Sequence, residues 1–259
     1  MLKITDFSKT YKGGKKAVSH LNLEILPGDI YGFIGHNGAG KTTTIKAAVG
    51  ILDFEEGEIL IDGHSIEKEP LLCKSMLAYI PDNPDLYDHL TGIQYLNFIG
   101  DIYGVGKAER EERIQRYADA LELTASLGDL ISAYSHGMKQ KLAIISALLH
   151  EPRLLILDEP FVGLDPKASH TLKELMHELC GRGGAIFFST HVLDVAEKLG
   201  CPVMALTARS SVKALEEQAR RFRPRLAVLT DEKAAADLRV RLADLPVRVS
   251  AGMDGLCEA

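Results

Sequence analysis

A glycine-rich segment that ends in lysine and threonine constrains the fold of this chain more than any other feature. Residues 35–42 read Gly-His-Asn-Gly-Ala-Gly-Lys-Thr and match the phosphate-binding pattern G-x-x-x-x-G-K-[ST] at every fixed position. The apolar residues 30–34 before it are typical of a buried strand, and residues 43–49 after it are typical of a helix. A strand, a loop and a helix in this order predict an α/β sheet with a nucleotide at its edge.

The residue types of this loop suit a phosphate chain. Glycines let the backbone fold around an anion so that its N–H groups point inward, and the next helix adds partial positive charge. Lys41 would reach the β- and γ-phosphates, and the Thr42 hydroxyl would bind Mg²⁺. The alternative is a glycine-rich turn without a ligand. The predicted nucleotide-binding residues are Gly35, His36, Asn37, Gly38, Ala39, Gly40, Lys41, Thr42 and Thr43.

The composition argues against several other classes of protein. A net charge of −6 gives no electrostatic basis for nucleic acid as a partner. The four cysteines are widely scattered without a C-x-x-C pair, which argues against a disulfide framework or a cysteine metal site and fits a reducing cytosol. The first residues do not resemble a signal peptide, and no apolar stretch approaches the roughly 18 residues that a membrane span needs. We therefore expect any membrane role to depend on a partner.

Strand and helix patterns alternate along most of the chain. Residues 2–9 and 18–26 read as strands joined by a turn, and the apolar segments 154–157 and 185–189 read as strands separated by helices. Between Thr91 and Leu127 the pattern is helical. We predict a P-loop NTPase core with a parallel-type central sheet, an N-terminal antiparallel β-subdomain, and a helical subdomain inserted at about residues 85–134.

Acidic and polar residues follow two of the predicted strands. Asp158 and Glu159 end the apolar run 154–157, at the edge where open α/β sheets bind ligands. Asp158 would hold Mg²⁺, and Glu159 would act as general base toward the water that attacks the γ-phosphate. An exposed pair of acids at a strand end is the common alternative. His191 follows the next strand, where a histidine would reach the γ-phosphate, although such a residue is more often structural.

Residues 134–141, Tyr-Ser-His-Gly-Met-Lys-Gln-Lys, resemble the signature motif of ABC-type ATPases, usually written L-S-G-G-Q. Ser135 and Gly137 match the fixed positions, whereas Tyr134, His136 and Met138 depart from them. The form Y-S-H-G-M is similar to that of cassettes serving ABC-2-type exporters. Ser135 is suited to cap the next helix, whose N-terminus would hold a phosphate. In this family that phosphate belongs to the ATP on the opposite cassette, a role the resemblance implies for Ser135, His136, Gly137 and Met138.

The resemblance assigns further roles and covers about residues 1–205. It implies that Tyr11 stacks on adenine, although a tyrosine packed on the sheet is the alternative, and that Asp165 lies in a loop at the dimer interface. It also makes His191 the switch histidine. Asp82 stands where the family has a glutamine that binds Mg²⁺, so we predict it as a further Mg²⁺ ligand of altered character. We place the ATP-binding domain at residues 1–208 and a tail of unknown role at 209–259.

The resemblance implies an ATP-binding and ATP-hydrolysing subunit of a membrane-embedded ABC transporter, an exporter by its signature. The expected partners are a membrane-spanning permease and a second cassette, in a homodimer or heterodimer, at the inner face of the cell membrane. The segment 85–95, with Leu86, Tyr87 and Leu90, is the candidate permease contact. Two alternatives remain open: a soluble ABC-type ATPase acting on ribosomes or DNA, and a nucleotide-responsive interaction protein that does not turn ATP over.

Overall fold

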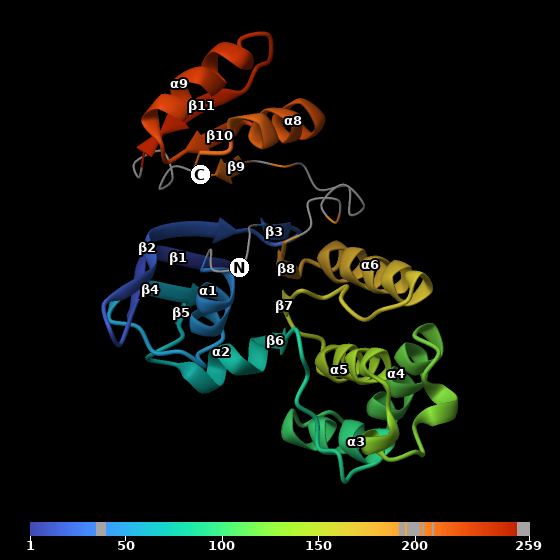
Figure 1. Cartoon of the computed structure of the whole chain (residues 1–259). Helices are drawn as coiled ribbons and strands as arrows, with labels where there is room; N and C mark the ends of the chain where they lie inside the picture. The colour runs from blue at the N-terminus through green and yellow to red at the C-terminus, as the bar shows by residue number, and fades with distance from the viewer. Residues whose placement is uncertain (35–39, 192–194, 196–202, 204, 209, 253–259) are drawn as a thin grey trace. The chain divides into compact units, whose positions relative to one another are not determined.

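A four-stranded parallel sheet carries the phosphate-binding segment and follows the order β3-β8-β7-β6 (Figure 1). The computed structural model describes residues 1–34, 40–191, 195, 203, 205–208 and 210–252. The central strands β7 and β8 are buried along their whole length, which explains their continuous apolar sequences. The strands are β3 (Ile30–Ile34), β6 (Leu77–Ile80), β7 (Leu154–Asp158) and β8 (Ala185–Thr190).

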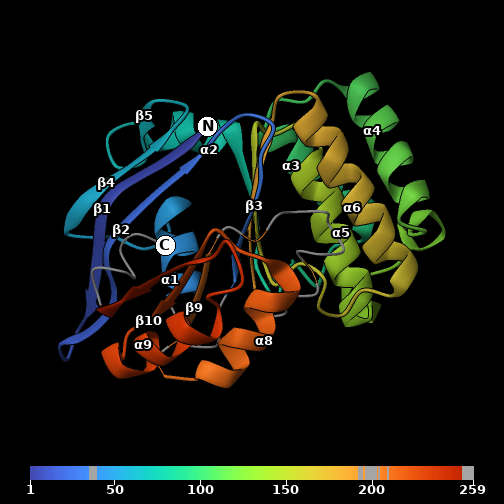
Figure 2. The same cartoon turned by 90° about the horizontal axis from the view of Figure 1, so that it is seen from above.

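Helices flank this sheet on both sides. The helix α1 (Lys41–Ala48) contacts β7, and α6 (Pro166–Gly181) contacts β8 and β3. Figure 2 shows α1 and α6 on opposite sides of the strands. A short helix, α2 (Pro70–Met76), precedes β6 and was not predicted, because its seven residues show too little apolar periodicity to be recognised.

A second, four-stranded sheet at the N-terminal part has the order β2-β1-β4-β5. The pairs β1/β4 and β4/β5 are antiparallel, as the predicted β-subdomain requires. Both N-terminal strands extend further toward their common turn than predicted. The strands are β1 (Leu2–Tyr11), β2 (Lys15–Ile25), β4 (Glu56–Ile61) and β5 (His64–Ser65).

The predicted helical segment at about 85–134 contains α3 (Gly92–Ile102) and α4 (Lys107–Ala120), and α5 (His136–Leu148) follows it and packs with them. Thr91 begins α3 with a capping box, in which its hydroxyl accepts a hydrogen bond from the Gln94 N–H and the Gln94 side chain accepts one from the Thr91 N–H. Short 3₁₀ turns at 124–126 and 131–133 connect α4 to α5. Because α3, α4 and α5 contact one another, they pack as a separate layer beside the sheet.

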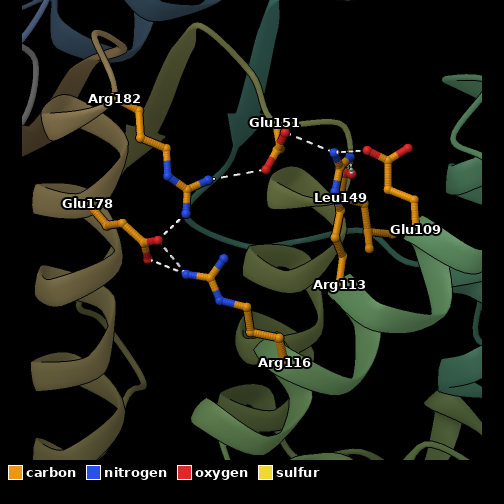
Figure 3. Close-up of polar contacts among 7 residues, drawn as sticks. All are labelled: Glu109, Arg113, Arg116, Leu149, Glu151, Glu178 and Arg182. Atoms are coloured by element: carbon orange, nitrogen blue, oxygen red, sulfur yellow. Dashed lines mark hydrogen bonds and ion pairs between the residues drawn. The ribbon is translucent and has the colours of Figure 1, made fainter.

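A network of ion pairs joins α4 to α6 (Figure 3). Glu178 of α6 pairs with Arg116 of α4 and with Arg182. Glu151, just beyond α5, pairs with Arg182 at 3.1 Å and with Arg113 of α4 at 2.8 Å. Single exposed ion pairs contribute little to stability, so the value of this network lies in fixing α4 and α6 relative to each other.

The chain divides into two compact units, and the second contains residues 192–259 with residues 20–22. This division falls before the predicted boundary at residue 208. The second unit has its own parallel sheet, β11-β10-β9, and its helices contact each other on one face. Buried residues such as Leu215, Leu229 and Leu238 form its core. The elements among its described residues include β9 (Ala205–Ala208), α8 (Val212–Phe222), β10 (Leu226–Leu229), α9 (Glu232–Arg241) and β11 (Arg248–Ala251).

Gly32 provides a direct test of the packing within the parallel sheet. It lies opposite Phe188 on the neighbouring strand, and a Cβ atom at this position would stand 2.7 Å from the Phe188 ring. We expect Gly32→Ala to lower the free energy of unfolding by about 1–3 kcal/mol, because the ring has to shift. Urea unfolding followed by circular dichroism measures this change. Gly181→Ala is the control, since a Cβ there meets no atom within 4 Å, and equal effects of both variants would contradict the expectation.

Candidate nucleotide site

The carboxyl ends of β3, β7 and β8 bring the predicted site residues to one edge of the sheet. Ile34, the last residue of β3, lies opposite Thr190, and Asp158 lies opposite Ser189. The start of the phosphate-binding segment, Asp158 and His191 therefore lie next to one another at this edge. Gly35, His36, Asn37, Gly38 and Ala39 lie outside the described residues.

The helix α1 begins directly after this segment. Gly40 is its N-cap residue and has a φ of 87°, which is favourable only for glycine. Its carbonyl accepts hydrogen bonds from the Thr44 N–H at 2.9 Å and the Thr44 hydroxyl at 3.0 Å. Lys41 is buried, with 6% of its surface exposed, and takes part in an interaction there. The first turn of α1 is thus fixed at the place where the loop is predicted to hold phosphates.

Asp158 is held at both of its carboxylate oxygens. Its carboxylate is almost completely buried, and each oxygen accepts a hydrogen bond from a different element. The Thr42 hydroxyl of α1 donates to Oδ2 at 2.9 Å, and the Ser189 hydroxyl of β8 donates to Oδ1. Ser189 was not predicted as a site residue, although its place near the end of an apolar strand beside β7 was a usable signal. These two hydrogen bonds offset the cost of burying the carboxylate.

The Thr42–Asp158 pair fits the binding of Mg²⁺. A hydroxyl oxygen and a carboxylate oxygen lie 2.9 Å apart, and hard oxygen ligands of this type are what Mg²⁺ prefers. Mg²⁺ usually takes only one or two protein ligands and completes its shell with water and phosphate oxygens. This explains why no cluster of three or more His, Cys, Asp or Glu side chains able to hold a metal is found among the residues that the structure describes.

Glu159 and His191 form a second polar pair beside Asp158. His191 Nδ1 lies 2.8 Å from Glu159 Oε1, and because an ionised carboxylate only accepts, the imidazole donates in this hydrogen bond. Glu159 has a φ of 49°, in the left-handed region that non-glycine residues rarely adopt. Its N–H donates to the Ser189 carbonyl at 3.1 Å. Backbone strain of this kind, held by its surroundings, is characteristic of functional sites.

Asp82 lies just beyond β6, the strand next to β7. Its Oδ1 accepts a hydrogen bond from the Asn83 N–H at 2.9 Å, and its side chain is exposed. Burial raises the pKa of the Tyr79 hydroxyl, and the negative charges of Asp158 and Asp82 raise it further. Both carboxylates thus act on the same tyrosine from the ends of adjacent strands. A direct role of Asp82 in metal binding stays a prediction.

Tyr11, the predicted adenine-stacking residue, ends β1 close to the phosphate-binding segment. Its hydroxyl lies 3.2 Å from the Thr43 hydroxyl in the first turn of α1. The side chain is 41% exposed, so its ring is not packed into the sheet core. This position is compatible with contact to a base, which stays a prediction.

The signature segment lies at the start of α5. Ser135 is the N-cap residue, as predicted, and its hydroxyl accepts a hydrogen bond from the Met138 N–H at 3.3 Å. The helix begins at His136. Asp165 caps α6 by accepting from the Ala168 N–H at 2.8 Å, and pairs with Lys141 of α5 at 2.9 Å. Lys141 was missed, because nothing in the sequence brings α5 next to this loop.

Comparison with known families agrees with this geometry. Residues 18–162 match the family model described as "ABC transporter". The chain belongs to this family, as an ATP-binding subunit. A second family model, described as 1-deoxy-D-xylulose 5-phosphate reductoisomerase, matches residues 179–259. That resemblance covers less than a third of the chain and falls mainly on the second unit.

Individual relatives and solved structures point the same way. The chain is 34% identical to the ABC-type transporter ATP-binding protein EcsA of Bacillus subtilis, over 84% of this chain and 90% of that protein. It is 40% identical to the bacitracin transport ATP-binding protein BcrA of Bacillus licheniformis, over 77% and 64% of the two chains. An ATP-binding subunit of an ABC transporter superposes with a TM-score of 0.74 at 38% identity, over 78% and 83%. A dimeric ATP-binding cassette bound to ADP and Pi superposes with a TM-score of 0.68 at 25% identity, over 76% of this chain and 90% of that chain. Within the described part of the chain, no helix is long and apolar enough to cross a membrane.

Ser189 allows a test of how Asp158 is held. Ser189→Ala removes the hydroxyl that donates to Oδ1 and leaves a buried carboxylate oxygen without that partner. We expect the variant to lose about 1.5–3 kcal/mol of unfolding free energy, the usual value of a hydrogen bond to a charged group. Urea unfolding measures it, and the exposed Ser132→Ala is the control. A change below about 0.5 kcal/mol, as for ordinary surface sites, would show that the hydrogen bond is unimportant.

Proposed function

We propose that this chain binds and hydrolyses ATP with Mg²⁺ and thereby powers a membrane-embedded ABC transporter that works as an exporter. The observation that carries the proposal is the arrangement at the sheet edge. A buried Asp158 joined to Thr42 stands beside a Glu159 that is oriented by His191. Family membership supports ATP as the nucleotide.

The chain's own residues account for the steps of hydrolysis. Lys41 and the N-terminus of α1 bind the β- and γ-phosphates and offset their charge. Thr42 and Asp158 would hold Mg²⁺, which neutralises charge on the phosphate oxygens when it is bound. Glu159 accepts a proton from the water that attacks the γ-phosphorus, and the bond to the β–γ bridging oxygen breaks to give ADP and phosphate. His191 keeps the Glu159 carboxylate oriented and carries a second ring nitrogen that is available to the γ-phosphate.

A second cassette would complete each site. The N-terminus of α5, capped by Ser135, has backbone N–H groups suited to a phosphate, but the Ser135 hydroxyl is used within its own helix. The similar cassette bound to ADP and Pi is a dimer. We infer that residues Ser135–Met138 bind the γ-phosphate of ATP held by the other cassette, and that Asp165 lies at the same interface.

An exposed aromatic surface on the helical segment suits a membrane-spanning partner. Tyr87 is half exposed, and its ring contacts those of Tyr95 and Phe98, with centroids 6.1 and 5.7 Å apart. Ile102 is 60% exposed on the same helix as Phe98. Of the expected contact residues, Leu86 is buried and is part of the core instead. We infer that this surface binds the cytoplasmic helices of a permease, which would keep the chain at the inner face of the membrane.

The relatives favour transport over the two other interpretations. The names of EcsA and BcrA are those of transporter ATP-binding proteins, and that of BcrA specifies bacitracin transport. The export direction rests on the resemblance of residues 134–138 to exporter cassettes. The chain spans 64% of BcrA, so the substrate of that transporter is not carried over.

Glu159→Gln tests the hydrolytic role. The amide cannot accept a proton from water, so we expect ATP turnover to fall about 10²–10⁴-fold, the usual contribution of a general base. ATP affinity should stay close to that of the unchanged chain, because Lys41 and Thr42 are intact, and an ATP-bound dimer should accumulate. Phosphate release, nucleotide titration and analytical ultracentrifugation measure the three properties.

Two outcomes of this experiment would point elsewhere. Unchanged turnover in Glu159→Gln would remove Glu159 from the role of base. If the unaltered chain binds ATP but shows no turnover alone or in native membranes, the nucleotide-responsive interaction protein is the better interpretation. Glu174→Gln, on the exposed face of α6, is the matched control.

Tyr87→Ala with Phe98→Ala tests the permease surface. The double variant removes two aromatic rings far along the chain from the phosphate-binding residues, so its ATP turnover in detergent-free solution should be unchanged. We expect it to lose the detergent-solubilised, multi-span membrane protein that the full chain captures, since aromatic side chains dominate the energy of such interfaces. Mass spectrometry identifies the captured protein. Equal capture by the double variant and the unchanged chain would place the partner on another surface.

A further inference from the structure

The first turn of α5 packs tightly against the loop that leads from Glu159 to α6. Gly163 in this loop has a φ of 81°, and a Cβ atom built on it would stand 2.4 Å from Cδ2 and 2.9 Å from Nε2 of His136. The edge of the His136 ring therefore lies directly against the Gly163 backbone. On the other side, a Cβ atom on Gly137 would stand 2.7 Å from the Gly163 carbonyl oxygen. The His136 ring and the backbones of Gly137 and Gly163 are thus in close contact where α5 meets the loop.

A second contact holds the far end of the same loop. Lys141, one turn further along α5 and only 14% exposed, pairs with Asp165 Oδ2 at 2.9 Å. The Ala168 N–H and the Lys141 ammonium lower the pKa of the Asp165 carboxyl, so it stays ionised and keeps this pair. The loop 161–165 therefore contacts α5 both at Gly163, near its middle, and at Asp165, at its end.

The loop has little support of its own. Val162 and Gly163 are exposed, and within the loop the Leu164 N–H donates to the Phe161 carbonyl at 3.4 Å. The Val162 N–H donates to the Glu159 carbonyl at 3.1 Å, so a movement of the loop acts on the backbone of Glu159. Because short exposed loops with few buried contacts open easily, we expect the contacts with α5 to hold this one in place, together with the Asp165 cap of α6.

We propose that His136 is a positioning residue whose ring holds the loop 161–165 and, through it, the backbone of Glu159. The catalytic part of this inference rests on the proposed function, in which Glu159 is the base. The ring acts by shape, because the contact joins a ring edge to a glycine backbone. Where the signature motif has glycine at this position, as in L-S-G-G-Q, no such contact with Gly163 is possible.

Amide hydrogen exchange and turnover in the full chain test the proposal together. We expect His136→Ala to speed exchange of the Val162 and Leu164 amides about tenfold. It should also lower kcat about tenfold, because misplacing a catalytic group costs rate. Exchange is measured without nucleotide, so that it reports the contact with the loop and not the contact with ATP on the opposite cassette. His136→Phe restores a ring edge without nitrogen atoms and should recover most of both effects. His170→Ala, 73% exposed on α6, is the control.

The results separate the possible failures. If His136→Ala leaves exchange unchanged, or if His136→Phe behaves like His136→Ala, the positioning role by shape is wrong, whatever the turnover. If the unchanged chain has no turnover, the proposed function fails, whereas the exchange rates still decide whether His136 holds the loop.

A double-mutant cycle tests the contact itself. Gly163→Ala should disturb the loop strongly in the unchanged chain, because the methyl group meets the His136 ring. In a His136→Gly background the same substitution meets no ring and should speed exchange by a smaller factor. Contacting residues show such non-additivity, whereas independent residues do not. Additive effects on exchange would overturn the inference.

Discussion

The burial of one carboxylate, that of Asp158, organises the cassette. A charged group is stable inside a protein only when its oxygens are hydrogen-bonded, and here the two partners come from different elements, α1 and β8. Satisfying Asp158 therefore requires that the phosphate-binding segment, β7 and β8 end side by side. That same alignment puts Glu159 next to His191 and leaves the hydroxyl of Thr42 beside a carboxylate oxygen. The hydrogen bonding of the buried Asp158 thus stabilises this edge of the sheet and also brings the polar residues of the site together.

The parts of this arrangement that the sequence predicted correctly are local. The capping of α5 by Ser135, the apolar strand ending in Asp158 and the helix after Gly40 each depend on a few neighbouring residues, whose backbone preferences are sufficient to specify them. Ser189 and Lys141 were missed for the opposite reason. Their partners are 31 residues away for Ser189 and in another element for Lys141, so only the three-dimensional packing reveals them. The helix α2 escaped because seven residues give no clear period.

The two units of the chain have separate cores and separate resemblances. The first matches the ABC transporter family. The second, whose described residues include three parallel strands and the helices α8 and α9, lies mainly within the residues that resemble a different family. Within the first unit, the ion pairs of Glu151 and Glu178 connect the helical segment to α6, and the contacts of His136 and Lys141 connect it to the loop 161–165. The helical segment is therefore attached to the sheet layer near its nucleotide-binding edge and also away from that edge.

The alternation of side chains along β7 has a consequence for how this protein can change length. Successive residues of a strand face opposite sides of a sheet, so inserting or deleting a single residue between Leu154 and Asp158 would turn the carboxylate away from Thr42 and Ser189. The number of residues between Leu154 and Asp158 is therefore fixed. The turn between β1 and β2, whose residues 12–14 are exposed, has no such restriction. Natural variation in length is expected to accumulate there and to be absent from β7.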